Sequence, residues 1–526
     1  KLGTADGFRA LVNALHREDI GVLMDWSAVR FPRTEEGLAY FDGTLLYEEN
    51  GSGDTAVFRF GRAEVQSFLL SNVSFLANEF HLDGVRVIDM ASALWFQANE
   101  NRNCYGGGEN LDGASFLRRL SLTVHRKLPG FLLIADGSAE WPRTTAAVKD
   151  DGLGFDFRCN CGFTEGMLAY LGADEAGKSE RYGELSYAQL YQYSEQYILP
   201  LSHTFLSEQQ PTLLGRLGYL PFEERIALLR AFFGFVTAHP GKKLLFMGGE
   251  YGQFIEWNFD DSLDWHLVEQ YPMHTKMLEY SRALNKFYKE NRPFWEVDFD
   301  WNGFEWIDCN DSENSIITFV RKADNDADFL VVLCNFTPEV RHDYRIGVPK
   351  KGEYREVFNS DAEEFGGSGV KNEGDLHTED FAWHDREQSL VITVPPMATI
   401  YLRHKDTLPF VKRSTPEEET EVLVVKGAEK KKEKEPKKPA AKVSDSAQKE
   451  APQAEQSPRE AAEGKTASSE TETVKKPSAV PQNKPKGGEA KKTAAKARPH
   501  KTGAAKGAKK SAKPPKKSSK KKAAAQ

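Results

Sequence analysis

The apolar positions in the first 290 residues follow two alternating periods. Short apolar runs of the kind found in buried strands occupy residues 21–26, 84–87, 131–135, 154–157, 198–201 and 243–247. Between them, apolar residues recur at helical spacing in residues 5–17, 62–80, 115–126, 187–197, 222–238 and 273–288. Strands that alternate with helices in this way predict an α/β architecture built on a parallel sheet.

Residues 80–92 form the most informative of these repeats. The apolar spacing predicts a helix that ends near Phe80, a tight turn at Asp83-Gly84, and a short buried strand that runs into a loop. When such repeats close into a barrel, a polar residue at the carboxyl end of a strand points into the reaction site. Four strand ends carry polar pairs of this kind: Asp25 with Arg30, Arg86 with Asp89, Asp136 with Glu140, and His203 with Thr204.

The period changes to two after residue 288. Apolar runs at residues 315–321, 329–335, 354–359 and 389–394 predict an antiparallel sandwich of roughly 110 residues. Beyond residue 413 the chain is rich in Lys, Ala, Pro, Ser and Glu and poor in aromatic residues, a composition that predicts disorder. We therefore expect a partial (β/α) barrel in residues 1–292, a carboxyl-terminal β-sandwich in residues 293–405, and a disordered basic tail in residues 406–526.

The net charge of −8 hides an uneven distribution along the chain. Residues 414–526 hold 29 Lys and Arg against 15 Asp and Glu, whereas residues 1–413 hold 41 against 63. Residues 491–526 hold 14 Lys and Arg and no acidic residue. This segment is expected to attract polyanions by counterion release, unless it is only a solvated appendage.

Hydropathy and cysteine content indicate in which cellular compartment the protein is expected. No apolar run in the sequence reaches the roughly 18 residues that a membrane-spanning helix needs. The five cysteines form neither a disulfide framework nor a paired set of zinc ligands. We therefore expect a cytoplasmic protein with no membrane span, no metal and no other cofactor.

Several segments carry a family resemblance. They are residues 21–32, 83–94, 105–111, 134–142 and 199–203, the run His239-Pro-Gly-Lys-Lys-Leu-Leu-Phe-Met-Gly-Gly-Glu-Tyr-Gly that continues to Trp265, and Gly303-Phe304-Glu305-Trp306-Ile307-Asp308. Over about residues 1–405, the chain resembles the bacterial 1,4-α-glucan (glycogen) branching enzymes of the α-amylase superfamily.

This resemblance implies a fold and a reaction. The fold is a (β/α)8 TIM-type barrel followed by an all-β sandwich, and the reaction cuts an α-1,4 glucan chain and rejoins it through an α-1,6 bond. Family members carry an amino-terminal carbohydrate-binding module and two barrel strands ahead of the matching region. We therefore expect a carboxyl-terminal portion of such an enzyme, with a barrel that lacks its first two strands.

The catalytic positions that the family implies are substituted in this sequence. A retaining transglycosylase needs a carboxylate nucleophile and a carboxylic acid about 5–5.5 Å apart. The family's nucleophile, an Asp two residues after the strand-end arginine, corresponds to Ile88, its acid/base Glu to Asp136, and its third carboxylate to Thr204. Asp89 is only a neighbour, because a one-residue step turns a side chain to the opposite face of a strand unless a bulge intervenes.

The same resemblance implies that other residues of the family's sugar-binding site are kept in this sequence. Asp25, Arg86 and His203 are kept, and Arg30 replaces a substrate-contacting His of the family. Aromatic rings stack on glucose faces, which makes candidates of Trp141, Tyr251, Trp257 and Trp265. Structural alternatives stay open, since Asp25 and Arg86 could form only an ion pair, and His203 and the aromatic rings could belong to the core. Residues 158–163 lack the family's tryptophans, which weakens the case for a full acceptor groove.

Three functions compete at this stage. The first is a branching-enzyme-like protein of glycogen metabolism that is catalytically impaired and retained to bind α-glucan or a partner, such as an intact branching enzyme. The second is an active branching enzyme that uses Asp136 and Asp89 in an unusual geometry. The third is an interaction protein that acts through its basic tail.

Overall fold

The computed structural model describes residues 3–34, 37–40, 42–48, 54–96, 102–138, 141–202, 212–258 and 260–407. Contacts divide the chain into two units, Lys1–Glu433 and Lys434–Gln526, and every described residue belongs to the first. The predicted site residues Glu140, His203 and Thr204 lie outside the described residues, as does the predicted tail beyond Thr407. No helix in the described ranges is long and apolar enough to cross a membrane.

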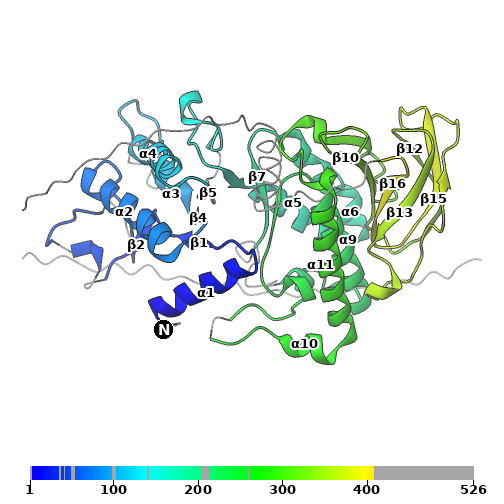
Figure 1. Cartoon of the computed structure of the whole chain (residues 1–526), viewed down its shortest axis with the longest axis horizontal. Coiled ribbons are helices and arrows are strands. Elements are labelled where there is room, and N and C mark those ends of the chain that lie inside the picture. The colour runs from blue at the N-terminus through cyan, green and yellow to red at the C-terminus, as the bar shows by residue number, and fades with distance from the viewer. Residues whose placement is uncertain are drawn as a thin grey trace, which may run out of the picture. The chain divides into compact units, whose positions relative to one another are not determined.

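A six-stranded parallel sheet organises the first half of the fold (Figure 1). In spatial order its strands are β1 (Leu23–Trp26), β4 (Gly84–Val87), β5 (Leu132–Ala135), β6 (Phe157–Cys159), β7 (Tyr197–Leu201) and β8 (Lys242–Leu245). All five neighbouring pairs are parallel. Among the described residues, β1 and β8 each pair along one edge only, so the predicted partial barrel is confirmed.

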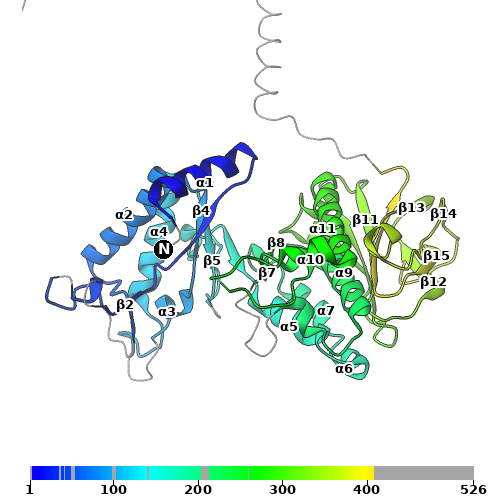
Figure 2. The ribbon, with the colours of Figure 1, turned by 90° about the horizontal axis from the view of Figure 1, so that it is seen from below.

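Helices connect these strands and cover the sheet (Figure 2). They are α1 (Ala5–Arg17), α2 (Ala63–Phe80), α3 (Met90–Leu94), α4 (Leu111–Lys127), α5 (Cys161–Leu171), α6 (Glu175–Glu180), α7 (Glu184–Tyr187), α8 (Leu213–Arg216), α9 (Phe222–Ala238), α10 (Trp265–Gln270) and α11 (Pro272–Glu290). Val85 and Val87 of β4 share one buried apolar cluster with Leu69 of α2 and Leu120 of α4. Because strand side chains alternate, Arg86 between them faces the other side of the sheet.

The turn before β4 folds as the sequence predicts. His81, directly after α2, adopts a left-handed φ of 54° and ends the helix. A Cβ placed on Gly84 would lie 2.5 Å from the carbonyl oxygen of Leu132. Only glycine therefore lets β4 come this close to β5, and the Asp83-Gly84 turn fixes where the strand begins.

Two predicted elements differ from the observed ones. The apolar run at residues 154–157 is largely a buried loop, since Phe155 is 2 % exposed and β6 begins only at Phe157. The helix predicted at residues 187–197 is wrong over most of its length, because α7 passes into a 3-10 turn at Ala188–Leu190 and β7 begins at Tyr197. Both errors arise where buried apolar residues lie in irregular backbone, which periodicity alone cannot distinguish from regular structure.

The second half of the described chain is the predicted antiparallel sandwich. One sheet has the order β14-β13-β16-β11-β10-β9 and the other pairs β12 with β15. The strands are β9 (Phe304–Asp308), β10 (Ile316–Lys322), β11 (Phe329–Asn335), β12 (Arg341–Val348), β13 (Glu353–Asn359), β14 (Leu376–His377), β15 (Gln388–Val394) and β16 (Ala398–His404). A separate small antiparallel pair joins β2 (Arg30–Pro32) to β3 (Thr55–Val57).

The larger sheet of the sandwich is buried on both faces. On one face, Val331 of β11 packs in a cluster with Ile346 of β12 and Leu390 of β15. On the other face, Tyr401 of β16 donates a hydrogen bond of 2.8 Å to the carbonyl oxygen of Gly234 in α9. The sheet therefore lies between helix α9 and the two-stranded sheet. The exact domain boundaries at residues 292 and 405 stay a prediction.

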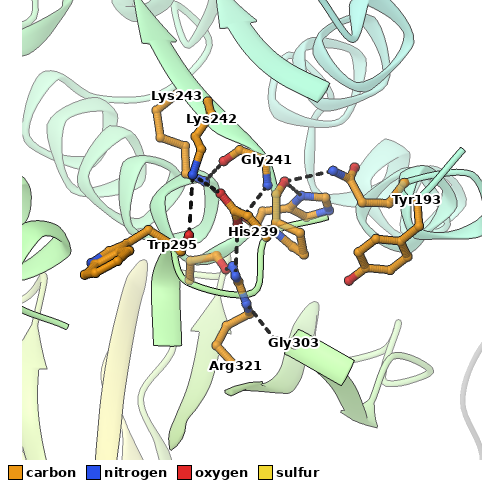
Figure 3. Close-up of polar contacts among 12 residues, drawn as sticks. Tyr193, His239, Gly241, Lys242, Lys243, Trp295, Gly303 and Arg321 are labelled. Atoms are coloured by element: carbon orange, nitrogen blue, oxygen red, sulfur yellow. Dashed lines mark hydrogen bonds and ion pairs between the residues drawn. The ribbon is translucent and has the colours of Figure 1, made fainter. Parts of the chain in front are cut away.

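A buried carboxylate joins the amino end of β8 to the sandwich (Figure 3). Asp298, whose side chain is 1 % exposed, accepts hydrogen bonds from the Gly241 N–H at 3.1 Å, Lys242 Nζ at 2.9 Å and Arg321 Nη2 at 3.0 Å. Burial alone would raise the pKa of Asp298, but the nearby Lys243, Arg321 and Lys242 outweigh burial and hold this pKa below its usual value. We call this group, Lys242, Lys243, Asp298 and Arg321, the amino-end cluster.

Candidate active site

The carboxyl ends of β1, β4 and β5 bring three of the predicted residues together. Arg86 donates to both carboxylate oxygens of Asp25, from Nε at 2.7 Å and from Nη2 at 2.6 Å. Its Nη1 lies 3.6 Å from Oδ2 of Asp136. The hydrogen bonds to Asp25 are the main cause that raises the pKa of Arg86. We call Asp25, Arg86 and Asp136 the carboxyl-end cluster.

The parallel register explains this arrangement. Asp25 lies directly beside Arg86 in the pairing of β1 with β4, and Val87 lies beside Ala135 in the pairing of β4 with β5. Asp136, one residue beyond β5, donates its backbone N–H to the Val87 carbonyl at 3.0 Å. Three neighbouring strand ends in register therefore place one guanidinium between two carboxylates. The geometry confirms an ion pair, and a sugar contact by these residues stays a prediction.

Ile88 comes two residues after Arg86 and one position beyond the end of β4, so strand alternation predicts that it shares the face of Arg86. Its backbone N–H donates to the Trp26 carbonyl at 3.3 Å, so the strand geometry continues through Val87 without a bulge in the described pairings. Asp89 then adopts a left-handed φ of 57° at the N-cap position of α3, where its side chain makes no capping hydrogen bond to the helix backbone. The side chain at the predicted nucleophile position is accordingly the half-buried isoleucine, and the neighbouring carboxylate is turned elsewhere.

Two ion pairs link residues of different strand ends. Arg86 pairs with Asp25, as the structural alternative in the sequence analysis has it, and Arg30 pairs with Asp89, which the sequence analysis did not expect. Arg30 Nε donates to Asp89 at 2.6 Å and Arg30 Nη2 donates to the Ser92 hydroxyl at 2.9 Å. The second pair forms because β2 and the start of α3 meet in space although Arg30 and Asp89 lie 59 residues apart.

Two cysteines border Asp136 and were not expected there. Burial is the main cause that raises the pKa of the Cys159 thiol, and the Asp136 carboxylate adds to it through its charge and a hydrogen bond. Burial likewise raises the pKa of Cys161 to about 11. Both thiols are therefore protonated at neutral pH and act as neutral neighbours. In the part of the chain that the structure describes, no three His, Cys, Asp or Glu residues are grouped to hold a metal ion.

The aromatic candidates fall into two groups. Tyr251 is fully buried, and its hydroxyl donates to Gln253 at 2.6 Å, so it lies in the core rather than on an open surface. Trp141 is half-buried and its ring meets that of Trp95 edge-on, with centroids 5.5 Å apart. Trp257 is 41 % exposed and helps to line a cavity of about 60 Å³ beyond the carboxyl ends of β7 and β8. Trp141 and Trp257 therefore remain the candidates for stacking on a sugar, together with the 48 % exposed Trp265.

Fold and strand-end chemistry together define the class of protein. A partial (β/α) barrel followed by an all-β sandwich is the architecture of the α-amylase superfamily, and residues 306–405 match the family model described as "Alpha amylase, C-terminal all-beta domain". The fold is similar to that of a pullulanase from Bacillus acidopullulyticus, with a TM-score of 0.54, 16 % identity, and coverage of 75 % of this chain and 48 % of that one. A pullulanase from Anoxybacillus sp. LM18-11, solved with maltotetraose, gives a TM-score of 0.53 at 14 % identity and covers 75 % and 55 % of the two chains.

Within this superfamily, the chain is a relative of the bacterial 1,4-α-glucan branching enzymes. It is 42 % identical over 414 residues to the branching enzyme GlgB of Halothermothrix orenii, covering 77 % of this chain and 65 % of the relative. It is 41 % identical over 415 residues to that of Aquifex aeolicus, covering 77 % and 66 %. The resemblance found in the sequence is confirmed, and the chain spans just under two thirds of the length of these relatives.

Proposed function

We propose that this chain is a cytoplasmic branching-enzyme relative of glycogen metabolism that binds α-glucan but neither cuts nor transfers it. One observation carries the proposal. The residue two positions after Arg86, where strand alternation predicts the same face of the sheet, is Ile88. Its side chain offers neither a lone pair nor a charge, so the covalent route through a glycosyl intermediate is lost.

The surroundings of Ile88 support the same conclusion. Arg86 already compensates the charge of Asp25, and Ile88 adds no negative charge beside it. An oxocarbenium-like transition state is cationic and needs a preorganised negative environment. The positive charge of Arg86, without a carboxylate at position 88, would destabilise a cationic transition state. The same guanidinium can still donate hydrogen bonds to sugar hydroxyls.

Glucan binding needs only the parts of the site that remain. Asp25 keeps 55 % of its side chain exposed while it is bound to Arg86, so its carboxylate can also accept hydrogen bonds from hydroxyls. Trp257 offers an exposed ring face on which a glucose unit can stack. An intact branching enzyme is the protein partner that this proposal favours, because both proteins would meet on one glucan.

The alternative of an active enzyme is weaker on geometry. It requires Asp89 to act with Asp136, but Asp89 is bound by Arg30 at 2.6 Å and accepts from the Ser92 hydroxyl at 2.9 Å. Freeing Asp89 would break both contacts and would still leave the one-residue step that turns it from the face of Arg86. We therefore expect no activity from this pair.

The test is an assay of branching on amylose, followed by the spectrum of the iodine complex. This chain is expected to leave the spectrum unchanged, and the Aquifex aeolicus relative serves as the active control. Introducing Ile, Asp and Thr at the three aligned positions of that relative should abolish its activity. Clear branching by this chain that is lost in Asp136→Ala would overturn the proposal and favour the active enzyme.

Restoration gives a sharper version of the same test. Residues that act as a unit are strongly non-additive, so Ile88→Asp alone should recover almost nothing. The triple change Ile88→Asp, Asp136→Glu and Thr204→Asp should recover some transfer when the chain is extended upstream to the length of its relatives. Recovery depends on Asp25, Arg86 and His203 still being correctly placed.

A second candidate function rests on the charge of the tail. Residues 491–526 hold 14 Lys and Arg and no Asp or Glu, which favours weak binding of polyanions by counterion release. Retention on heparin should fall between low and moderate salt, and removal of residues 491–526 should abolish it. Retention that does not change with salt concentration, or that persists after this deletion, would contradict polyanion binding by the tail.

A further inference from the structure

A polar groove of about 640 Å³ lies between helices α2 and α4, which are neighbours on the outside of the parallel sheet (Figure 2). This volume falls within the roughly 300–1,000 Å³ of ordinary ligand sites. Every lining residue belongs to α2 or α4, so the groove shares none with the carboxyl-end cluster.

The two walls of this groove are polar faces at helical spacing. Their residues recur at intervals of four and three: Ser67, Ser71 and Ser74 on α2, and Arg119, Thr123 and Arg126 on α4. Residues at these intervals share one face of a helix. A polar face is ordinary where a helix meets water, but here two such faces border one hollow.

Three cations line the groove without a carboxylate partner in the described part of the chain. Arg119 Nη1 donates to the neutral amide oxygen of Gln66 at 2.7 Å. The side chains of Arg126 and Lys127 form no ion pair with any residue that the structure describes. These two cations complement the negative carboxyl end of the α4 dipole. Arg119 lies about two turns earlier, where the helix dipole gives no reason for a cation.

The groove is positive within an acidic part of the chain. Its lining holds one carboxylate, Glu79, which lies 3.3 Å from Arg9 Nη2 and is therefore already paired. The carboxyl ends of α2 and α4 each add about half a negative charge, which the three cations exceed. Residues 1–413 as a whole hold 41 Lys and Arg against 63 Asp and Glu. The groove is thus a local site of attraction for anions in a domain that otherwise repels them.

Several hydrogen-bond donors of the groove are available to a ligand. The hydroxyls of Ser67 and Ser71 bind no other residue in the described ranges. Ser74 and Thr123, in contrast, donate to carbonyl oxygens of their own helices at 2.8 and 2.7 Å. The available donors are therefore two hydroxyls, two guanidinium groups and one ammonium group. Guanidinium groups bind phosphate oxygens through two parallel hydrogen bonds.

The spacing of the cations indicates which anion fits. Seven residues separate Arg119 from Arg126, which corresponds to about 10 Å along the helix axis. A single phosphate ion would face only one end of this row, whereas a chain of linked phosphates carries charge along all of it. Phe75, which is 52 % exposed, also lines the groove and offers a flat apolar surface to a nucleotide base.

We infer that the groove between α2 and α4 binds linked phosphates, as found in inorganic polyphosphate and in the phosphate chain of a nucleotide, through Arg119, Arg126 and Lys127. Both helices pack on β4, since Leu69 of α2 and Leu120 of α4 share a buried cluster with Val85. A ligand that joins the two helices therefore stabilises the folded protein as well. The inference is independent of the proposed glucan chemistry.

The test is a calorimetric titration of the full chain with tripolyphosphate, for the wild type and for Arg119→Gln combined with Arg126→Gln. Removing two charge-assisted contacts should raise the Kd of this site at least about tenfold. Arg282→Gln combined with Lys289→Gln is the matched control. These exposed cations have the same seven-residue interval on α11 but do not line the groove, so this variant should bind as the wild type does.

A second measurement separates the groove from the basic tail, which is also expected to attract polyanions. Tripolyphosphate should slow hydrogen exchange at the carboxyl end of α4, residues 119–127, in the wild type and not in the double variant. The same tenfold difference in Kd should appear when residues 491–526 are removed from both proteins. Affinity should fall as the salt concentration rises, because ions screen exposed charges.

Further ligands identify the source of the phosphates. Equal affinities for ATP and tripolyphosphate would assign the site to the phosphate chain alone, and tighter binding of ATP would add a contact between its base and Phe75. Both results support the inference. Inorganic phosphate should bind at least about tenfold more weakly than tripolyphosphate, because it meets fewer of the cations.

Three results would overturn the inference. The first is an unchanged Kd in the double variant with no slowed exchange at residues 119–127, which would leave the tail as the binding site. The second is equal affinity for inorganic phosphate and tripolyphosphate. The third is tighter binding of a polyglutamate peptide than of tripolyphosphate, which would assign the groove to an acidic protein partner. Because these results do not depend on the branching assay, failure of the proposed function is recognised separately.

Discussion

The two ends of the parallel sheet carry charged clusters that differ in composition and in burial. Three cations surround one carboxylate at the amino end, and one guanidinium lies between two carboxylates at the carboxyl end. In the amino-end cluster, Arg321 is 0 % and Asp298 1 % exposed, while Lys242 keeps 35 % of its side chain exposed. In the carboxyl-end cluster, Arg86 is 11 % exposed but Asp25 is 55 % exposed. In barrels of this type, the carboxyl end carries chemistry and the amino end carries stability. We therefore expect the fold to depend more on the buried Asp298–Arg321 pair than on the Asp25–Arg86 pair, whose carboxylate is half exposed.

Among these changes, Asp298→Ala is expected to lower the free energy of unfolding most. It leaves Arg321 buried opposite no carboxylate and should lower the free energy of unfolding by about 3–5 kcal/mol, as measured by urea denaturation. Asp380→Ala is the control, because Asp380 pairs with Lys351 at the surface, where both side chains are more than 60 % exposed. This control should cost about 0–1 kcal/mol. Equal losses in the two variants would break the comparison.

A rise in pH is expected to have a smaller effect on the free energy of unfolding. Burial is the main cause that lowers the pKa of Lys243, to about 7 from 10.5. Between pH 7 and pH 8.5 the unfolded chain therefore binds a proton that the folded chain has released, so stability should rise with pH. The rise should be about 1–2 kcal/mol over this window, and urea denaturation at several pH values measures it.

Lys243→Met should flatten this rise, because methionine keeps the length of the side chain without its charge. The window ends at pH 8.5 because the cysteine thiols of the unfolded chain, whose ordinary pKa is about 8.5, are by then half-ionised and oppose the rise. A slope that persists unchanged in Lys243→Met would assign the effect to another group.

Substitution in the carboxyl-end cluster should lower the free energy of unfolding less. Asp25→Asn keeps a hydrogen-bond acceptor for Arg86 and removes a charge that is half exposed, so the loss of stability should be about 1 kcal/mol. Affinity for maltoheptaose at the barrel should fall several-fold in the same variant. A loss comparable to that of Asp298→Ala would mean that both clusters are structural.

The smallest effect is expected from Ile88→Asp. A new carboxylate two residues after Arg86 gains a nearby cation while it loses a half-buried apolar side chain. The free energy of unfolding should change by less than about 1 kcal/mol. A severe loss, seen in the same denaturation assay, would show that this end of the sheet has closed around the isoleucine.

The sequence predicted the regular elements well and the partners of charged residues poorly. The helix at residues 5–17 and the strand at residues 84–87 were placed correctly, because each has one clear apolar period. The segment 158–163 was expected only as an aromatic-poor stretch, although Asn160 caps α5 by accepting from the Phe163 N–H at 3.0 Å. That cap was a readable signal, since an Asn before an apolar run is a common helix start.

The positions of the candidate site and its Asp25–Arg86 pair were predictable, but its Arg30–Asp89 pair was not. Strand ends in register had to bring Asp25, Arg86 and Asp136 together, and they did. The Arg30–Asp89 pair depends on where the segment that contains β2 packs against the start of α3. No local sequence pattern specifies that packing.

The close contact at Gly84 separates the requirements of the fold from those of a reaction. Any side chain at position 84 would collide with the Leu132 carbonyl, whereas the half-buried position 88 has no such constraint from the neighbouring strand. A sequence can therefore resemble an enzyme family through residues that set the spacing of its strands, whatever residue stands at the position of the nucleophile. In this chain Gly84 reports on the fold, and only the residue four positions later bears on catalysis.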